Sequence, residues 1–135
     1  MLREDNFDFS FSGLKTAVRR IVESEKMTEE MKSQLAREFE DATADVLVGK
    51  TMRAVDEFGA NTVVVGGGVS ANEYIRKCLA EALAVAGNPA QLLVPPPDLA
   101  TDNALMISLA GYFHARNKEY ADPATLAANG NLKLA

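Results

Sequence analysis

A β-branched run followed by three glycines occupies residues 63–72, Val63-Val64-Val65-Gly66-Gly67-Gly68-Val69-Ser70-Ala71-Asn72. The valines predict a buried strand, and glycines at its end let a ligand come close to the main chain because they carry no side chain. The helix expected to follow offers unpaired N–H groups to an anion. The stretch therefore predicts a nucleotide or phosphate cradle. The alternative is a tight strand-to-helix turn in which Ser70 or Asn72 caps the helix.

The composition is that of one ordinary globular domain. The 135 residues include 14 Lys and Arg against 19 Asp and Glu, a formal net charge of −5. This balance gives no net attraction to a phosphate backbone, so contact with nucleic acid would need a local basic patch such as Lys15, Arg19 and Arg20. Cys78 is the only cysteine, which excludes an internal disulfide and favours a reducing compartment. With no signal-peptide pattern and no stretch long enough to span a membrane, the expected location is the cytoplasm.

The hydrophobic pattern predicts helices around one short sheet. The expected elements are, in the order helix, helix, strand, helix, strand, helix, residues 14–23, 28–58, 62–65, 71–86, 91–94 and 102–116. Thr28 is the expected N-cap of the long helix and Gly59 its expected end. The strand–helix–strand segment predicts two parallel neighbouring strands, and residues 121–135 are expected to form a weakly structured tail.

The number of strands is low for a complete α/β domain. A two-stranded sheet leaves at least one edge in need of a partner. Phe7, Phe9 and Phe11 alternate with polar residues, which predicts a short strand or an extended arm with three rings on one face. Such a stripe is more often part of a core than a base-stacking platform. We therefore expect a mixed α/β chain that belongs to something larger.

A second polar helix start follows the second strand, at Thr101-Asp102-Asn103. In open α/β sheets ligands bind at the carboxyl ends of the strands, so both helix starts are expected to line one pocket. Asp102 is either a helix cap or first-turn carboxylate with no further role, or one oxygen ligand of a metal ion. His114, the only histidine, lies about three turns further along the same helix, so a complete metal site is not expected within the chain.

The sequence lacks the motifs that identify several enzyme classes. It contains no paired-histidine zinc-protease motif, no serine elbow and no phosphate loop ending in Gly-Lys-Ser/Thr. Cys78 has no plausible histidine base and is expected to be a small packing residue. The residues alone therefore indicate a binding pocket and no catalytic residue.

Three segments, taken together, resemble one protein family: Asp8-Phe9-Ser10-Phe11-Ser12-Gly13-Leu14-Lys15-Thr16-Ala17-Val18, residues 65–72, and residues 101–104 with Met106 and Ile107. In this order and spacing they are similar to the C-terminal half of the tRNA N6-adenosine threonylcarbamoyltransferase family, TsaD, formerly called glycoprotease or O-sialoglycoprotein endopeptidase. The resemblance runs from about residue 1 to residue 116. It implies one lobe of the actin-like ATPase and sugar kinase (ribonuclease H-like) superfold, with a small sheet flanked by helices. Residues 1–120 would be the C-terminal lobe, and the N-terminal lobe would be absent.

The resemblance also implies a reaction and a site. Members of the family move a threonylcarbamoyl group from threonylcarbamoyl-adenylate to N6 of the adenosine beside the anticodon of tRNA. By that similarity Gly66, Gly67, Gly68 and Asn72 contact the adenylate, or ATP, and Asp102 is a ligand of one divalent metal ion, iron or zinc. The similarity further implies tRNA, a TsaB-like paralogue and a TsaE-like ATPase as partners, and no membrane.

The two histidine ligands of the family belong to its N-terminal half and are not found in this sequence. The isolated chain is therefore expected to be inactive as a transferase and to bind nucleotide weakly or not at all. Two other functions remain open. The first is a non-catalytic interaction module in which helix 28–58 assembles with a partner lobe or paralogue. The second is a small-molecule kinase lobe of the same superfold, whose signature would be phosphorylation of a sugar.

Overall fold

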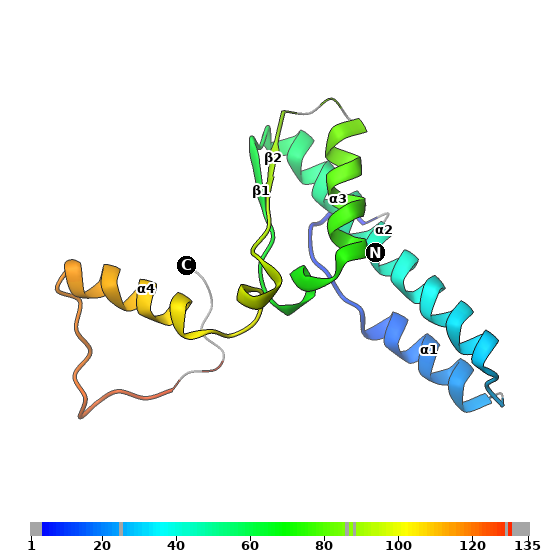
Figure 1. Cartoon of the computed structure of the whole chain (residues 1–135), viewed down its shortest axis with the longest axis horizontal. Helices are drawn as coiled ribbons and strands as arrows, with labels where there is room; N and C mark the ends of the chain where they lie inside the picture. Colours follow the sequence, from blue (N-terminus) through cyan, green and yellow to red (C-terminus); the bar gives the residue numbers. More distant parts are fainter. Residues whose placement is uncertain (1–3, 25, 86, 88, 129, 131–135) are drawn as a thin grey trace. The chain divides into compact units, whose positions relative to one another are not determined.

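A computed structural model describes residues 4–24, 26–85, 87, 89–128 and 130 of the chain. Over these residues the chain forms four α-helices, two 3-10 helices and a two-stranded parallel sheet (Figure 1). In chain order they are α1 (Ser12–Ser24), α2 (Glu29–Phe58), β1 (Thr62–Val64), η1 (Gly68–Ala71), α3 (Glu73–Val85), β2 (Gln91–Leu93), η2 (Pro97–Leu99) and α4 (Ala104–Arg116). The chain divides into two compact units, Met1–Thr101 and Asp102–Ala135, and each is described by itself. The prediction of a mixed α/β chain is confirmed.

The long helix α2 has the caps that the sequence predicts at both ends. Thr28 Oγ1 accepts a hydrogen bond from Met31 N at 3.2 Å, and two glutamates lie in the first turn, near the positive end of the helix dipole. Gly59 ends the helix in the left-handed conformation, with φ 58°, which glycine adopts without the steric cost of a Cβ. The N-terminal half of α2 lies beside α1 and its C-terminal half beside α3 (Figure 1).

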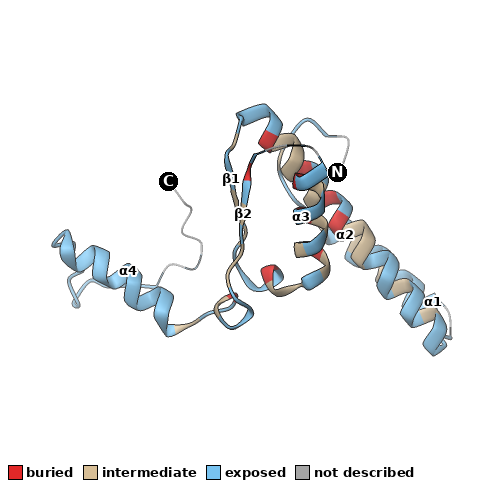
Figure 2. Ribbon diagram, turned by 45° about the horizontal axis from the view of Figure 1, so that its top comes forward, coloured by how far each residue is buried: buried red, intermediate tan, exposed pale blue. Residues whose placement is uncertain are grey.

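The core of the first unit lies between α2, α3 and one face of the sheet (Figure 2). β1 pairs in parallel with β2, with Val63 opposite Leu92, as the strand–helix–strand pattern predicts. The buried side chains form two clusters that both contact Leu92: Ala44, Ile75 and Leu79, and Val55, Leu83 and Ala90. On the other face Val64 and Leu93 are 74% and 43% exposed. Within the described first unit, helices therefore cover one face of a parallel sheet, whereas such sheets usually have both faces covered.

The element boundaries differ from the predicted ones where main-chain geometry changes at a cap. The predicted helix 71–86 is in fact a 3-10 turn followed by α3, which begins at Glu73, and residue 86 lies outside the described residues. The described part of the tail, residues 121–128 and 130, contains turns without helix or strand, and residues 129 and 131–135 are not described. Its separation from a lobe spanning 1–120 remains a prediction.

None of the helices in the described residues is long and apolar enough to cross a membrane.

Two cations of α2 hold the N-terminal arm, residues 4–11, along the helix. Lys50 is only 1% exposed, and its Nζ donates to Asp8 O at 2.7 Å. Arg53 Nη1 donates to Glu4 O at 2.9 Å. These two acceptors are main-chain carbonyls, and Lys50 Nζ also donates to the side-chain oxygen Asn6 Oδ1 at 3.1 Å, so the arm is fixed mainly along its backbone, although it forms no strand.

The phenylalanines of the arm contact α2 to different extents. Phe7 is half-buried, and its ring centroid lies 5.4 Å from that of Phe58. Phe9 is 47% exposed, and with Phe11 and Phe39 it lines an apolar groove of about 570 Å³. Of the two predicted forms, the extended arm is confirmed. One ring joins the edge of the core, and the other two leave a groove open beside it.

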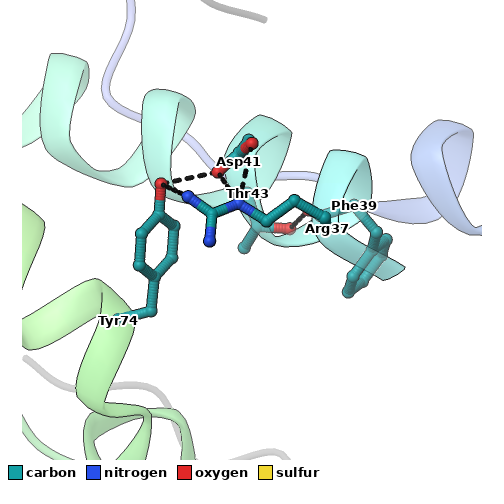
Figure 3. Close-up of polar contacts among 5 residues, drawn as sticks. All are labelled: Arg37, Phe39, Asp41, Thr43 and Tyr74. Atoms are coloured by element: carbon teal, nitrogen blue, oxygen red, sulfur yellow. Dashed lines mark hydrogen bonds and ion pairs between the residues drawn. The ribbon is translucent and has the colours of Figure 1, made fainter. Parts of the chain in front are cut away.

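A polar cluster of Arg37, Asp41 and Tyr74 joins α2 to α3 (Figure 3). Tyr74 OH donates to Asp41 Oδ1 at 2.5 Å, and Arg37 Nε lies 3.1 Å from the same oxygen. The Arg37 guanidinium carbon lies 4.7 Å from the centre of the Tyr74 ring. The hydrogen bond to Asp41, together with burial, raises the pKa of Tyr74 to about 12. The same hydrogen bond, supported by Arg37, lowers the pKa of Asp41.

We expect Tyr74→Phe to flatten the dependence of stability on pH at its alkaline end. Because the pKa of Tyr74 is higher in the folded chain, its contribution is complete below pH 10.0 and is lost as the pH rises from 10.0 to about 12. Asp41 has a lowered pKa, so its contribution is present above its ordinary value of 3.8 and is lost as the pH falls through the lower folded value. The variant should also lose less stability in acid, because Asp41 no longer accepts the tyrosine hydrogen bond.

The measurement is the melting temperature as a function of pH for the wild type and Tyr74→Phe. Tyr112→Phe is the matched control because Tyr112 is 59% exposed on α4, in the other unit. It should keep the wild-type profile. Identical profiles for the wild type and Tyr74→Phe would contradict the assignment of the alkaline transition to Tyr74.

Candidate functional site

The three glycines form an exposed turn at the carboxyl end of β1. Gly67 has φ 81° and ψ 171°, a backbone conformation that side-chain-bearing residues rarely adopt. A Cβ at Gly66 or Gly67 would meet no other atom of the described residues within 4 Å, and one at Gly68 would lie 3.9 Å from Thr101 Cγ2. The space beside the main chain is therefore open, as the predicted cradle requires.

Asn72 caps α3, which was one of the two roles that the sequence left open for it. Its Oδ1 accepts a hydrogen bond from Ile75 N at 3.0 Å. This bond uses one of the two lone pairs of the oxygen, whereas the amide Nδ2 of Asn72 is a donor that a ligand could use. Asn72 also lines the apolar groove between the arm and α2, and Val69 of η1 lines the same groove. Capping of α3 by Asn72 therefore leaves its amide nitrogen available for a ligand.

Ser70 is buried inside the turn. It is 1% exposed, and its Oγ has no hydrogen-bond partner among the described residues. Its main-chain N–H donates to Gly67 O at 2.9 Å, so the turn is closed through the backbone and does not use the hydroxyl. Of the two capping residues that the sequence left open, Asn72 and not Ser70 caps α3.

We expect Ser70→Ala to raise the free energy of unfolding by about 1 kcal/mol, because it removes a buried hydroxyl whose lost hydration is not compensated. Urea denaturation of the wild type and the variant measures the change. Ser108→Ala, at an exposed position of α4, should change the same quantity by less than about 0.5 kcal/mol. A loss of stability in Ser70→Ala would show instead that a bound water satisfies the hydroxyl.

Asp102 is the first residue of the second unit and precedes α4. Asn103 Oδ1 accepts from Met106 N at 2.9 Å, so the N-cap of α4 is Asn103. The predicted helix start at residue 102 is therefore wrong by two residues, and Asp102 is neither a cap nor a first-turn carboxylate. Its side chain is exposed and makes no hydrogen bond or ion pair with the residues that the structure describes. The carboxylate is thus free to act as an oxygen ligand.

Metal ligands do not gather in the part of the chain that the structure describes, where no three His, Cys, Asp or Glu side chains are close enough to hold an ion. His114 Nδ1 lies 2.7 Å from Glu119 Oε2 at the other end of α4. Asp102 fits a divalent cation in donor type, since carboxylate oxygen is a common ligand, but it supplies only one donor. The structure brings Gly66, Gly67, Gly68 and Asn72 together in the first unit, and Asp102 belongs to the second.

Arg76 joins the segments that follow the two strands, and sequence reasoning missed it. Its Nη2 donates to Pro95 O at 2.8 Å and its Nε donates to Ser70 O. No motif marks the residue, because its partners are carbonyl groups that any residue could supply. Its partner Pro95 is 19 residues away along the chain, so the sequence holds no signal for this contact.

Two kinds of comparison bear on family membership. The family model "TsaD: tRNA N6-adenosine threonylcarbamoyltransferase" matches residues 2–109. The chain is 42% identical over 132 residues to the tRNA N6-adenosine threonylcarbamoyltransferase of Limosilactobacillus fermentum, which covers 96% of this chain and 38% of that protein. It is 40% identical over 134 residues to the one of Thermosipho africanus, which covers 99% of this chain and 40% of that protein. It thus spans about two fifths of the length of these relatives. The chain belongs to the TsaD family.

Proposed function

We propose that this chain forms the part of a tRNA threonylcarbamoyltransferase that holds the adenylate of the substrate and contributes one ligand of a divalent metal ion. The whole enzyme would move the threonylcarbamoyl group from threonylcarbamoyl-adenylate to N6 of the adenosine beside the anticodon. In this proposal residues 1–120 form one lobe of the actin-like ATPase and sugar kinase superfold. The enzyme would act on tRNA in the cytoplasm, with a TsaB-like paralogue and a TsaE-like ATPase as partners.

The observation that carries the proposal is the open glycine turn at the carboxyl end of β1, which η1 connects to α3. Nothing within 4 Å would meet a Cβ at Gly66 or Gly67 among the described residues, so a phosphate or ribose oxygen can approach the main chain there. Apart from the N–H of Ile75, which Asn72 binds, the first N–H groups of α3 have no partner within the helix. These groups and the positive end of the helix dipole favour an anion such as the phosphate of an adenylate.

Each residue of the proposed site has a defined task. The glycines permit close approach, and Asn72 Nδ2 donates a hydrogen bond to the adenylate. Asp102 holds the metal ion, iron or zinc by the resemblance, together with two imidazoles that this sequence does not contain. When bound, such an ion polarises the carbamoyl group as a Lewis acid. The sequence has one histidine, so the site needs donors from another part of the enzyme.

Complementation tests the proposal. This chain is mixed with a second chain that carries the part of the Limosilactobacillus fermentum relative outside the matched region, together with the proposed TsaB-like and TsaE-like partners, ATP, tRNA, threonylcarbamoyl-adenylate and metal ion. Modified adenosine is then quantified by nucleoside chromatography. We expect modification in the mixture and none with either chain alone. Robust turnover by this chain alone would sink the idea that it holds only part of a site.

A second function, assembly with a partner lobe or paralogue, is favoured by the apolar groove of about 570 Å³ beside α2. Phe9 and Phe39, which line it, are 47% and 41% exposed. Cross-linking to the second chain, measured for the wild type and for Asp102→Ala, discriminates the two functions. Cross-links of equal yield in both, in a wild-type mixture that forms no modified adenosine, would favour the assembly module.

A further inference from the structure

We propose that Arg76 is a positioning residue that holds the glycine turn and the proline segment after β2 in one fixed arrangement. It would shape the edge of the sheet at which a ligand binds without touching the ligand itself. We call the two hydrogen bonds of Arg76, to Ser70 O and to Pro95 O, the brace, and infer its role from geometry alone. Its effect on adenylate binding rests on the function proposed above.

The guanidinium group of Arg76 reaches both segments at once. It is half-buried on α3, donates from Nη2 to Pro95 O at 2.8 Å and donates from Nε to Ser70 O. Ser70 follows the glycines that leave β1, and Pro95 follows β2. Hydrogen bonds from a charged donor are stronger than neutral ones, and the planar fork of arginine fixes the direction of both. One side chain therefore ties together the main chain beyond the carboxyl ends of the two strands.

These two segments need a side-chain brace because the sheet does not extend to them. The last ladder bond joins Val65 N to Leu93 O at 3.0 Å. Beyond it, residues 95–97 are all proline and have no N–H group to donate, whereas the glycine turn is the most costly kind of segment to order. An external donor is thus the available means of fixing the Pro95 carbonyl.

The braced segments also meet further along the chain. The methyl group of Thr101 would lie 3.9 Å from a Cβ at Gly68, so the end of the proline segment comes up against the glycine turn. Thr101 is the last residue of the first unit and is bonded to Asp102. By holding Pro95 and Ser70, Arg76 therefore fixes how the end of the proline segment passes the glycine turn within the first unit.

Amide hydrogen exchange of the 135-residue chain, followed by NMR, tests the brace. The probes are Ser70 N, bonded to Gly67 O, and Leu99 N, bonded to Pro96 O, one in each segment. Arg76→Met keeps the stem and removes the donors. We expect it to accelerate exchange at both probes by about tenfold while the buried part of α2 keeps its protection.

Two variants complete the design. Lys77→Met is the matched control, because the adjacent Lys77 points to solvent, with its side chain 70% exposed and 3.8 Å from Glu81, and it should leave both probes unchanged. Arg76→Lys keeps the charge without the planar fork and should behave like Arg76→Met. Acceleration at one probe only, equal acceleration throughout α2, or full protection in Arg76→Lys would each overturn the positioning role.

The consequence for binding is measured separately in the complemented mixture. There Arg76→Met should raise KM for threonylcarbamoyl-adenylate by about tenfold and leave kcat within about twofold, since the residue orders the binding edge and takes no part in the chemistry. If the wild-type mixture forms no modified adenosine, the proposed function fails while the exchange result still decides the brace. An unchanged KM alongside accelerated exchange would overturn the link to binding.

Discussion

Asp102→Asn is expected to lower threonylcarbamoyl transfer in the complemented mixture by at least about a hundredfold, the loss that even an outer-sphere substitution can cause at a metal site. Asparagine has the shape of aspartate but lacks the negative charge that a divalent cation favours. Stability should stay within about 0.5 kcal/mol of the wild type, because Asp102 is exposed and Asn103, not Asp102, caps α4. Initial rates of adenosine modification and urea denaturation measure the two effects.

Asp98→Asn provides the matched control for this experiment. Asp98 is an exposed carboxylate four residues earlier, in η2, and its replacement by asparagine removes one negative charge, as Asp102→Asn does. It should retain wild-type transfer. Equal rates for the two asparagine variants would remove Asp102 from the proposed metal site. The stability measurement separates that outcome from a folding defect.

Gly67→Ala is expected to lower the free energy of unfolding by about 1–3 kcal/mol. Its φ of 81° and ψ of 171° lie in a region where a Cβ collides with the residue's own backbone, so the cost arises although no neighbouring atom of the described residues lies within 4 Å. Urea denaturation of the two chains gives the difference directly. The large effect comes from one backbone angle and not from packing.

Gly66→Ala is the control for backbone strain. Gly66 is not among the glycines with positive φ, and a Cβ there meets open space, so its stability should change by less than about 0.5 kcal/mol. It should nevertheless reduce transfer in the complemented mixture, because the added methyl group occupies the space that the proposed adenylate would enter. Equal destabilisation by both alanines would contradict the assignment of the strain to Gly67. Undiminished transfer by Gly66→Ala would contradict the proposed cradle.

The sequence predicted best the features that depend on neighbouring residues. Thr28 and Gly59 mark the ends of α2 because capping and the left-handed conformation are local properties of their residue types. The parallel pairing of β1 with β2 followed from the helix between them. The first residues of the helices were harder to predict. Asp and Asn are both favoured at the N-cap, so local preference does not decide whether Asp102 or Asn103 caps α4. The same ambiguity applied to Ser70 and Asn72.

The candidate site was predicted in its parts but not in its arrangement. The glycine turn, Asn72 and Asp102 were all singled out, and the family follows from the segments that contain them. The brace by Arg76 and the unpaired hydroxyl of Ser70 were not predicted, because both depend on where distant backbone segments come to lie. Pro95 is 19 residues from Arg76, and no periodicity links the two. Tertiary contacts to carbonyl groups leave no residue-specific trace.

The contact of Lys50 with the N-terminal arm sets a limit on how far this protein can be trimmed. An ammonium group that is 1% exposed has Asp8 O and Asn6 Oδ1 as its acceptors, at 2.7 and 3.1 Å. Removal of the first eight residues, by a protease or by a shorter expression boundary, would take away both acceptors together with chain that packs against this ammonium group. Hydrogen bonds to charged groups contribute about 1.5–3 kcal/mol each to stability. The smallest stable folding unit therefore begins before the first helix, in residues that form no regular element.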